Sequence, residues 1–176
     1  MRMAVLLAML VCSAALAASS SALAQNLSPA TGLDGAYDDQ NPFARILRGE
    51  APRASVLETD DVIVIVPLSQ ASRGHLLVIP KCRCRTLADV PPSQLTAVMT
   101  TLQRLMAAER LAYNPDGFNV RQNNGADAGQ TVFHVHFHLM PRYAGQPLLA
   151  EDENRLSPEA MDAAAAEVRS ALARLP

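Results

Sequence analysis

The pattern of apolar and polar positions changes its period several times along the chain, and it predicts both strands and helices. Short apolar runs rich in β-branched residues, bounded by turn residues or proline, are typical of strands. Five runs fit this description: Ser55–Glu58, Val62–Val66, His75–Pro80, Phe118–Arg121 and Val132–Met140. We expect the first two to form a hairpin. We expect the last two to be antiparallel, because one polar loop joins them.

Helical spacing of apolar residues appears in three other segments. Pro42 begins a short helix that ends at Gly49. From Pro92 to about Leu111 the spacing predicts a long amphipathic helix, with an apolar side made of Leu95, Val98, Met99, Leu102, Leu105 and Met106. Ser157 is placed to cap an alanine-rich helix that we expect to reach about Leu175.

These elements predict an α+β fold, with an antiparallel sheet of about five strands, one long helix packed on it and a further C-terminal helix. The chain has 176 residues, which suits a single domain. We place that domain at residues 41–145, after a flexible leader at 25–40 that is rich in Ser, Gly, Asp and Asn. Residues 146–176 are expected to be a linker and the last helix.

Residues 1–24 have the pattern of a cleaved secretory signal peptide. Arg2 precedes an apolar run from Met3 to Ala18, and Ala22-Leu23-Ala24 provides the small residues of a cleavage site. The run is shorter than the roughly 20 residues that a membrane-spanning helix needs. We therefore expect a periplasmic or secreted protein with no membrane attachment after cleavage.

Composition excludes several classes of function. Lys and Arg total 15 against 17 Asp and Glu, a net charge of −2, so the chain lacks the basic character of a nucleic-acid-binding protein. No glycine-rich phosphate loop and no Ser-His-Asp arrangement is visible. The unusual feature is histidine: of the four in the chain, three lie within five residues, at His134, His136 and His138.

Alternation on a strand would place these three imidazoles on one face, with the apolar residues between them on the other. Successive imidazoles would start about 7 Å apart and the outer two about 13 Å apart. One metal ion could not easily bind all three, although two of them with His75 remain a possible metal set. The alternative is that a neutral imidazole itself is the nucleophile, as its ordinary pKa allows near neutral pH.

Cys82 and Cys84 form a Cys-x-Cys pair, and they are the two cysteines that remain after signal cleavage. In an exported protein such a pair could be a local disulfide, a free dithiol or part of a metal site. The sequence leaves these three alternatives open.

The stretch Gly129–Met140 resembles the histidine triad (HIT) family, whose pattern is His-φ-His-φ-His-φ-φ, where φ is apolar. Further similarity lies at Arg48–Glu50, Gly74–Lys81 and Phe118–Gly125, in matching order and spacing. The resemblance implies a HIT-like fold and a homodimer. It also implies cleavage of nucleoside phosphoramidates, dinucleoside polyphosphates or nucleotidyl esters, without a cofactor.

The resemblance also implies roles for individual residues. His136 would attack the α-phosphorus and carry a covalent nucleotidyl intermediate. His134, His138 and His75 would complete the catalytic set and govern protonation and phosphate contacts. The phosphate and the leaving group would be held by a loop with four matching residues: Asn123, Gly129, Gln130 and Thr131. The Thr131 hydroxyl stands where it could assist protonation of the leaving group.

Two positions depart from the family pattern. Where some members have a structural zinc site built on Cys-x-x-C and a histidine, this chain has Asn41-Pro42-Phe43-Ala44 and Arg83, so no metal is expected there. Where an acidic residue often binds the ribose hydroxyls, this chain has Pro67. We therefore consider two hypotheses: a nucleotidyl hydrolase or transferase that uses His136, and a non-catalytic exported protein that binds a nucleotide or a metal.

Overall fold

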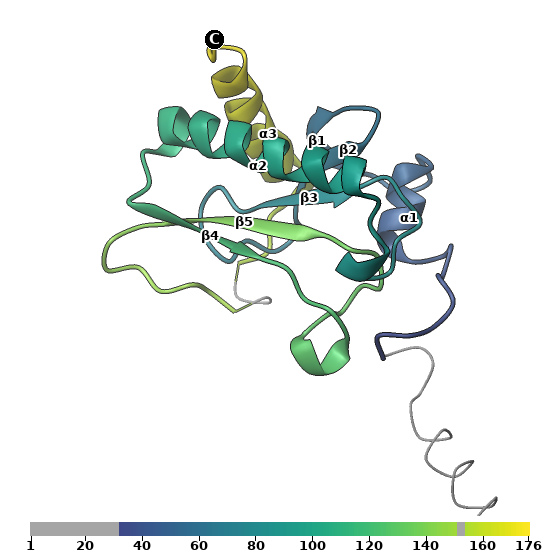
Figure 1. The fold of residues 1–176 in the computed structure, drawn as a ribbon. Coiled ribbons are helices and arrows are strands. Elements are labelled where there is room, and N and C mark those ends of the chain that lie inside the picture. Colours follow the sequence, from purple (N-terminus) through teal and green to yellow (C-terminus); the bar gives the residue numbers. More distant parts are fainter. Residues whose placement is uncertain (1–31, 151–153) are drawn as a thin grey trace, which may run out of the picture. The chain divides into compact units, whose positions relative to one another are not determined.

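The five predicted strands pair into one antiparallel sheet in the order β1-β2-β3-β5-β4, as seen in the computed structural model (Figure 1). The elements are α1 Pro42–Leu47, β1 Ala54–Glu58, β2 Val62–Val66, β3 Leu76–Pro80, α2 Pro92–Tyr113, β4 Gly117–Arg121, β5 Phe137–Arg142 and α3 Pro158–Leu172, with short 3₁₀ turns at Leu87–Asp89 and Ala126–Ala128. The predicted α+β class and the hairpin of the first two strands are confirmed.

The structure describes residues 32–150 and 154–176. The predicted signal peptide at 1–24 and the first part of the predicted leader lie outside the described residues. Contacts divide the chain into two units, Met1–Ala36 and Tyr37–Pro176, and the fold described here is that of the second. Among the described residues, no helix combines the length and the hydropathy that a membrane crossing requires.

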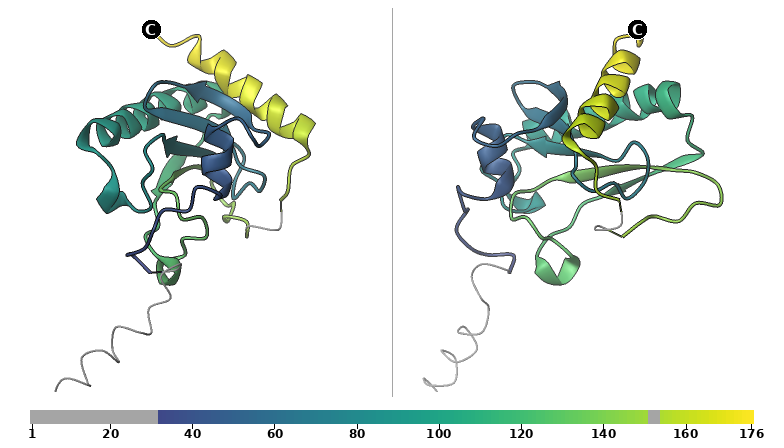
Figure 2. Two further views of the ribbon diagram at one scale, coloured as in Figure 1. Left: turned by 90° about the vertical axis from the view of Figure 1, so that its right-hand side faces the viewer. Right: turned by 180° about the vertical axis from the view of Figure 1, so that it is seen from behind.

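The two faces of the sheet are covered differently. Helices α2 and α3 lie together on one face, as the views in Figures 1 and 2 show, and form the larger core with residues such as Val64, Val78 and Leu139. The opposite face packs against α1 through Phe43 and Leu77. Because strand residues alternate between faces, a side chain on the α1 face lies away from the main core.

The last strand begins later and ends later than predicted. The structure starts β5 at Phe137, not Val132, and continues it through Pro141 to Arg142. The ladder between β3 and β5 ends with the pair Val78–Phe137, and beyond it the carbonyl of Pro80 accepts a hydrogen bond from the ring of His134. Pro141 is tolerated because β5 pairs at that point with β4 alone.

The helices follow the predicted pattern with two corrections to their ends: α2 continues to Tyr113 and α3 stops at Leu172. On α2, Val98, Leu102 and Leu105 are buried as the spacing requires, whereas Met99 is 42% exposed. On α3, three residues on one side are fully buried in the main core: Ala165, Val168 and Ala171. The C-terminal helix is thus part of the same packed unit as the sheet.

Candidate active site

His75 and His138 lie side by side because their strands are neighbours. His75 directly precedes β3, and His138 on β5 pairs with Leu77 of β3. The Nε2 atom of His75 lies 2.9 Å from Nδ1 of His138, and the two rings are stacked with centroids 5.1 Å apart. Only His138 of the three clustered histidines is on a strand, so the prediction that all three lie on β5 is wrong.

The ring of His75 is held by contacts on both nitrogens. The amide of Ala71 lies 3.2 Å from Nδ1, a backbone hydrogen bond with Ser69 also acts on the ring, and Nε2 faces Nδ1 of His138. The buried amide of Gln70 holds this arrangement, since it bonds to both the backbone N–H and the carbonyl of His75.

His136 occupies the middle of the cluster. Its Nδ1 atom lies 2.7 Å from the carbonyl oxygen of His134, which can only accept, so the ring proton is on Nδ1 and the lone pair is on Nε2. The ring contacts that of His138, with centroids 5.0 Å apart, and meets the edge of Phe43 at 4.8 Å. His136 is 8% exposed. A neutral imidazole with its lone pair on a defined nitrogen has the form that a nucleophile requires.

His134 is fully buried, and both its ring nitrogens have protein partners. Nε2 donates to the carbonyl of Pro80 at 2.8 Å, and Nδ1 accepts from the hydroxyl of Tyr37 at 2.5 Å. The sequence predicts a catalytic role for His134. In the structure this ring has no nitrogen available to a substrate, so its contribution to chemistry would come through the backbone carbonyl that orients His136.

Burial keeps the histidines neutral. Desolvation is the largest cause that lowers the pKa of His75 and of His134 to about 4, and that of His138 to about 3. The neighbouring His136 and then His75 lower the pKa of His138 further, and the charge of Arg121 acts in the same direction on both His75 and His138. At neutral pH these three rings are therefore uncharged.

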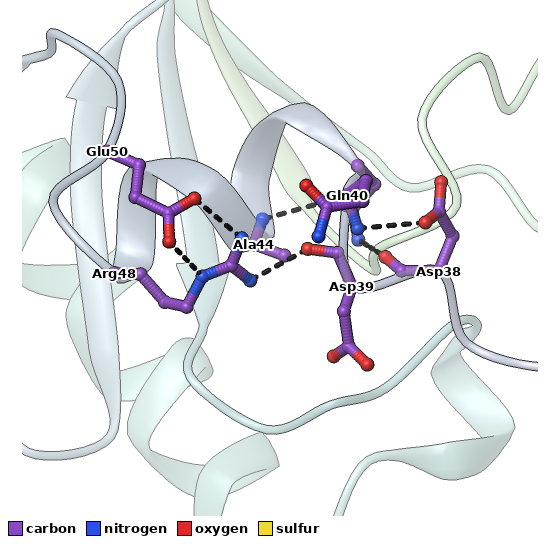
Figure 3. A network of polar contacts seen from close by, with 7 residues as sticks. Asp38, Asp39, Gln40, Ala44, Arg48 and Glu50 are labelled. Atoms are coloured by element: carbon purple, nitrogen blue, oxygen red, sulfur yellow. Dashed lines mark hydrogen bonds and ion pairs between the residues drawn. The ribbon is translucent and has the colours of Figure 1, made fainter.

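The turn that leads into α1 is held by its own polar contacts (Figure 3). Asn41 is the N-cap of the helix, and its Oδ1 accepts from the amide of Ala44 at 2.9 Å. Its Nδ2 donates to the carbonyl of Asp38. A capped helix start fixes the direction of the preceding chain, and here that chain carries Tyr37.

A second set of contacts holds the same turn from the end of α1. Arg48 pairs with Glu50 and also donates to the carbonyl of Asp39 at 2.7 Å (Figure 3). The carboxylate of Asp39 pairs with Arg83, whose guanidinium lies over the ring of Tyr37 at 5.4 Å. Tyr37 is thereby positioned between Arg83 and His134.

The polar loop between β4 and β5 is braced by its own side chains. Asn123 donates to the carbonyl of Gly129, which has φ 82° and lies so close that an added Cβ would be 3.3 Å from the Asn123 amide. Gln130 is buried and bonds to the amide of Gly125 and the carbonyl of Arg85. The resemblance implies that Gln130 belongs to the loop that holds the phosphate and the leaving group, and in the structure its side chain bonds to backbone groups in and beside that loop.

Two further positions singled out in the sequence, Thr131 and Pro67, differ in the side-chain groups that they present to a ligand. Thr131 is exposed and directly follows this loop, so its hydroxyl is accessible to a ligand. Pro67, at the position where the resemblance expects an acidic residue, has no polar side chain for a ribose. Nothing at Pro67 replaces that carboxylate.

The positions where some family members bind zinc are occupied here by residues with other roles. Asn41 caps a helix, Ala44 has no ligand atom, and Arg83 pairs with Asp39. Cys82 and Cys84 form a disulfide, which decides between the three alternatives that the sequence left open. Within residues 32–150 and 154–176, no group of three or more His, Cys, Asp or Glu side chains is placed to hold a metal ion.

The disulfide lies just after β3. This part of the chain hydrogen-bonds at two points to residues 134–136, which we call the histidine segment. Pro80 accepts from the ring of His134, and the carbonyl of Cys84 accepts from the amide of Val135 at 2.9 Å. This second bond falls between His134 and His136. The segment that follows β3 therefore supports the backbone on which the histidine cluster is built.

Sequence reasoning missed two residues of this site, Tyr37 and Gln70. Tyr37 falls in a polar stretch without periodicity, and the usable signal was the capping sequence Asn41-Pro42, which marks where ordered chain begins. Gln70 is a polar residue in the loop before β3, and nothing in the local pattern distinguishes it.

An α+β sheet domain that joins His75, His138, His136 and His134 in one chain of contacts defines a histidine-cluster class of proteins. The family model for the HIT domain matches residues 48–145. The chain belongs to the HIT family.

Relatives of known structure and sequence agree with this assignment. A Hit-like protein from Bartonella henselae has a structure that superposes with a TM-score of 0.73 at 38% identity, covering 77% of this chain and 98% of that one. Adenylylsulfatase HINT3 from Arabidopsis thaliana is 36% identical over 132 residues, 75% of this chain and 67% of the relative. Adenosine 5′-monophosphoramidase HNT1 from Saccharomyces cerevisiae is 39% identical over 100 residues, 57% of this chain and 61% of the relative.

Proposed function

We propose that this chain is a nucleotidyl hydrolase or transferase in which Nε2 of His136 attacks the α-phosphorus of a nucleotide. The observation that carries the proposal is the hydrogen bond from Nδ1 of His136 to the carbonyl of His134, because it leaves the lone pair on Nε2. Two relatives support the reaction class, since one is named an adenylylsulfatase and the other an adenosine 5′-monophosphoramidase.

The reaction has two displacement steps. In the first, a bond forms between Nε2 of His136 and phosphorus, and the bond from phosphorus to the leaving group breaks, with the electron pair departing on the leaving group. In the second, water attacks phosphorus and the N–P bond breaks, so that the imidazole is restored. The sum consumes one water and releases a nucleoside monophosphate and the leaving group. Another acceptor in place of water would give transfer.

Neighbouring groups would stabilise the charge that develops on phosphorus. Nε2 of His138 would donate to the phosphate, because its Nδ1 faces His75 and its ring centroid lies 5.0 Å from that of His136. The loop that ends at the exposed Thr131 would supply a hydroxyl and backbone amides. We propose that Asn123, Gly129 and Gln130 act by holding this loop in shape.

Adduct formation tests the mechanism. Wild-type protein is mixed with adenosine 5′-phosphoramidate or adenosine 5′-phosphosulfate, quenched at alkaline pH to preserve the N–P bond, and analysed by intact mass and peptide mapping. We expect an adenylyl adduct on His136 and none in His136→Ala. An equal rate of turnover by a folded His136→Ala protein would overturn the proposal.

The alternative is a non-catalytic nucleotide-binding protein, and Pro67 in place of an acidic residue is the observation that favours it. Such a protein would bind adenosine 5′-monophosphate in calorimetry and yet form neither adduct nor product. The metal-binding version of this alternative has little support among the described residues, because Cys82 and Cys84 are oxidised.

We further propose a homodimer that forms through the edge strand β4. This strand ends the sheet, and an edge strand can pair with its own copy about a twofold axis. Val120 is 49% exposed on it, and a depression of about 540 Å³ beside it is lined by Met106 and Phe118, among others. Light scattering should give a dimer mass for wild type and for Leu68→Lys, a control at an exposed leucine elsewhere, but a monomer mass for Val120→Lys. A monomeric wild type would overturn this proposal.

We also propose that the protein is exported to the periplasm or secreted. The pattern of residues 1–24 supports this, and so does the disulfide between Cys82 and Cys84, because disulfides persist in oxidising compartments. Mass spectrometry of protein from the native host should find a mature N-terminus at Gln25. An intact N-terminus on protein from the cytoplasmic fraction would contradict the proposal.

A further inference from the structure

Arg121 is the last residue of β4 and lies directly opposite His138 on β5. Residues that face each other across an antiparallel pair project on the same side of the sheet, with Cα atoms about 5 Å apart. Phe118 is the β4 residue that packs into the main core, so Arg121, three positions later, belongs to the opposite face. That face carries His138 and the candidate active site.

The guanidinium of Arg121 is a cation that the chain does not neutralise locally. Arg121 is exposed, and none of the ion pairs formed among residues 32–150 and 154–176 includes it. Other arginines near the site, such as Arg48 and Arg83, do pair with carboxylates. The charge of Arg121 nevertheless reaches the cluster, since it lowers the pKa of both His75 and His138.

Arg121 supplies a charge that its neighbours in the histidine cluster lack. His75 and His138 are neutral at pH 7, because burial lowers the pKa of each, to about 4 and about 3 respectively. Sulfate and phosphate leave as anions, which a nearby cation stabilises. A guanidinium supplies that cation and keeps its charge throughout.

The position of Arg121 suits a contact with the leaving group rather than with the α-phosphate. The α-phosphorus has to approach Nε2 of His136, which is 8% exposed and packs against Phe43 on the α1 side. Arg121 is on the other side of the cluster, at the exposed rim formed by the end of β4. In an in-line displacement the leaving group departs away from the nucleophile.

We propose that Arg121 binds the anionic leaving group of the substrate and thereby raises kcat/KM for nucleotides whose α-phosphorus carries an oxyacid, such as sulfate or phosphate, relative to kcat/KM for phosphoramidates. The inference rests on the proposed function and specifies its substrate class. Arg121 acts as a specificity residue that contacts the substrate, and His136 remains the nucleophile.

The ratio of kcat/KM for oxyacid substrates to kcat/KM for the phosphoramidate tests this inference. kcat/KM is measured for adenosine 5′-phosphosulfate, for adenosine 5′-diphosphate and for adenosine 5′-phosphoramidate with wild type, Arg121→Gln and Arg121→Lys. Loss of a charge-assisted contact should lower kcat/KM for the two oxyacid substrates by about 10- to 100-fold in Arg121→Gln. The value for the phosphoramidate should change by less than about threefold, and Arg121→Lys should recover part of the loss.

Arg142→Gln is the matched control. Arg142 is exposed to an intermediate degree on the same strand pair and the same face, and it pairs with Gly117 about 13 Å further along. Removing this charge should leave all three values unchanged.

The outcomes separate the two proposals. If wild type turns over both kinds of substrate and Arg121→Gln reduces them equally, or reduces neither, the role of Arg121 is wrong while the reaction stands. If wild type forms an adduct with no substrate, the proposed function fails and this inference fails with it.

Discussion

The hydroxyl of Tyr37 donates a 2.5 Å hydrogen bond to Nδ1 of His134, so a residue ahead of the first helix fixes the first histidine of the cluster. The contact joins positions 97 residues apart. Since the carbonyl of His134 in turn orients His136, Tyr37 is linked to the proposed nucleophile through one intervening residue. Tyr37 is thus a positioning residue in the proposed mechanism.

Tyr37→Phe should weaken both stability and chemistry. The substitution keeps the ring but leaves Nδ1 of the buried His134 without its donor, which costs about 1–3 kcal/mol. We expect a lower free energy of unfolding in urea and a rate of adduct formation about tenfold slower at saturating substrate, with little change in KM. Tyr143→Phe is the control, because the Tyr143 hydroxyl bonds to the backbone carbonyl of Arg73 and not to a histidine ring. If Tyr143→Phe slows adduct formation as much as Tyr37→Phe does, the effect is not specific to His134.

Acid should destabilise the fold through the buried histidines. The folded-state pKa of His75 and of His134 is lowered to about 4, and that of His138 to about 3, against an ordinary value near 6.5. As the pH falls below 6.5 the unfolded chain takes up protons that the folded chain does not, so the free energy of unfolding decreases until the folded pKa values are reached. Each histidine contributes up to about 1.4 kcal/mol per pH unit.

Urea unfolding measured from pH 7.5 to 4.5 checks this dependence. His75→Gln should show a shallower slope than wild type, by about one proton, because one of the three titrating groups is gone. An unchanged slope in His75→Gln would show that this ring does not contribute.

The main features of the fold follow from local pattern alone. The β-branched run Val62–Val66 and the helical spacing after Pro92 each specify one kind of element, and both were predicted close to their observed ends. The alternation of His136 and His138 with apolar residues also predicts correctly that Phe137 and Leu139 face the main core.

Other features depend on partners that are distant in sequence. His134 and His136 continue the alternation but lie outside β5, because the ladder with β3 ends at Phe137 and the ring of His134 bonds instead to the carbonyl of Pro80. The contact between Tyr37 and His134 leaves no local signal, since a tyrosine in a polar stretch reads as part of a leader. These features require the three-dimensional structure.

Glu109 should destabilise the protein increasingly as the pH rises. It is fully buried on α2, and neither carboxylate oxygen has a hydrogen-bond partner among the described residues. Burial raises its pKa to about 9, so the folded state keeps the proton that the unfolded state loses above about pH 4.5. The stability that protonation preserves is present below pH 4.5 and is lost progressively up to about pH 9.

Glu109→Gln, a neutral side chain of similar shape, should remove this dependence. The difference in free energy of unfolding between Glu109→Gln and wild type should grow in favour of the variant from pH 5 to pH 8.5. Glu167→Gln is the control, since Glu167 is half-exposed and pairs with Arg73. A constant difference across this range would mean that Glu109 is ionised in the folded protein.

Reduction of the disulfide between Cys82 and Cys84 should loosen the histidine segment before it affects the sheet. The carbonyl of Cys84 accepts from the amide of Val135, so freedom gained by Cys84 is transmitted to the backbone between His134 and His136. The disulfide closes a very short loop, so its effect on the entropy of the unfolded chain is small, and the change should be local. Hydrogen exchange should therefore speed up at Val135 in reduced protein and in Cys82→Ser/Cys84→Ser.

The amide of Val64 in β2 is the internal reference for that measurement, because Val64 is buried in the main core and β3 separates its strand from β5. Its exchange should stay unchanged under the same conditions, and adduct formation at His136 should slow in parallel with the gain in exchange at Val135. Equal acceleration at Val135 and Val64 would mean that reduction unfolds the domain as a whole. No change at Val135 would mean that the disulfide does not support the histidine segment.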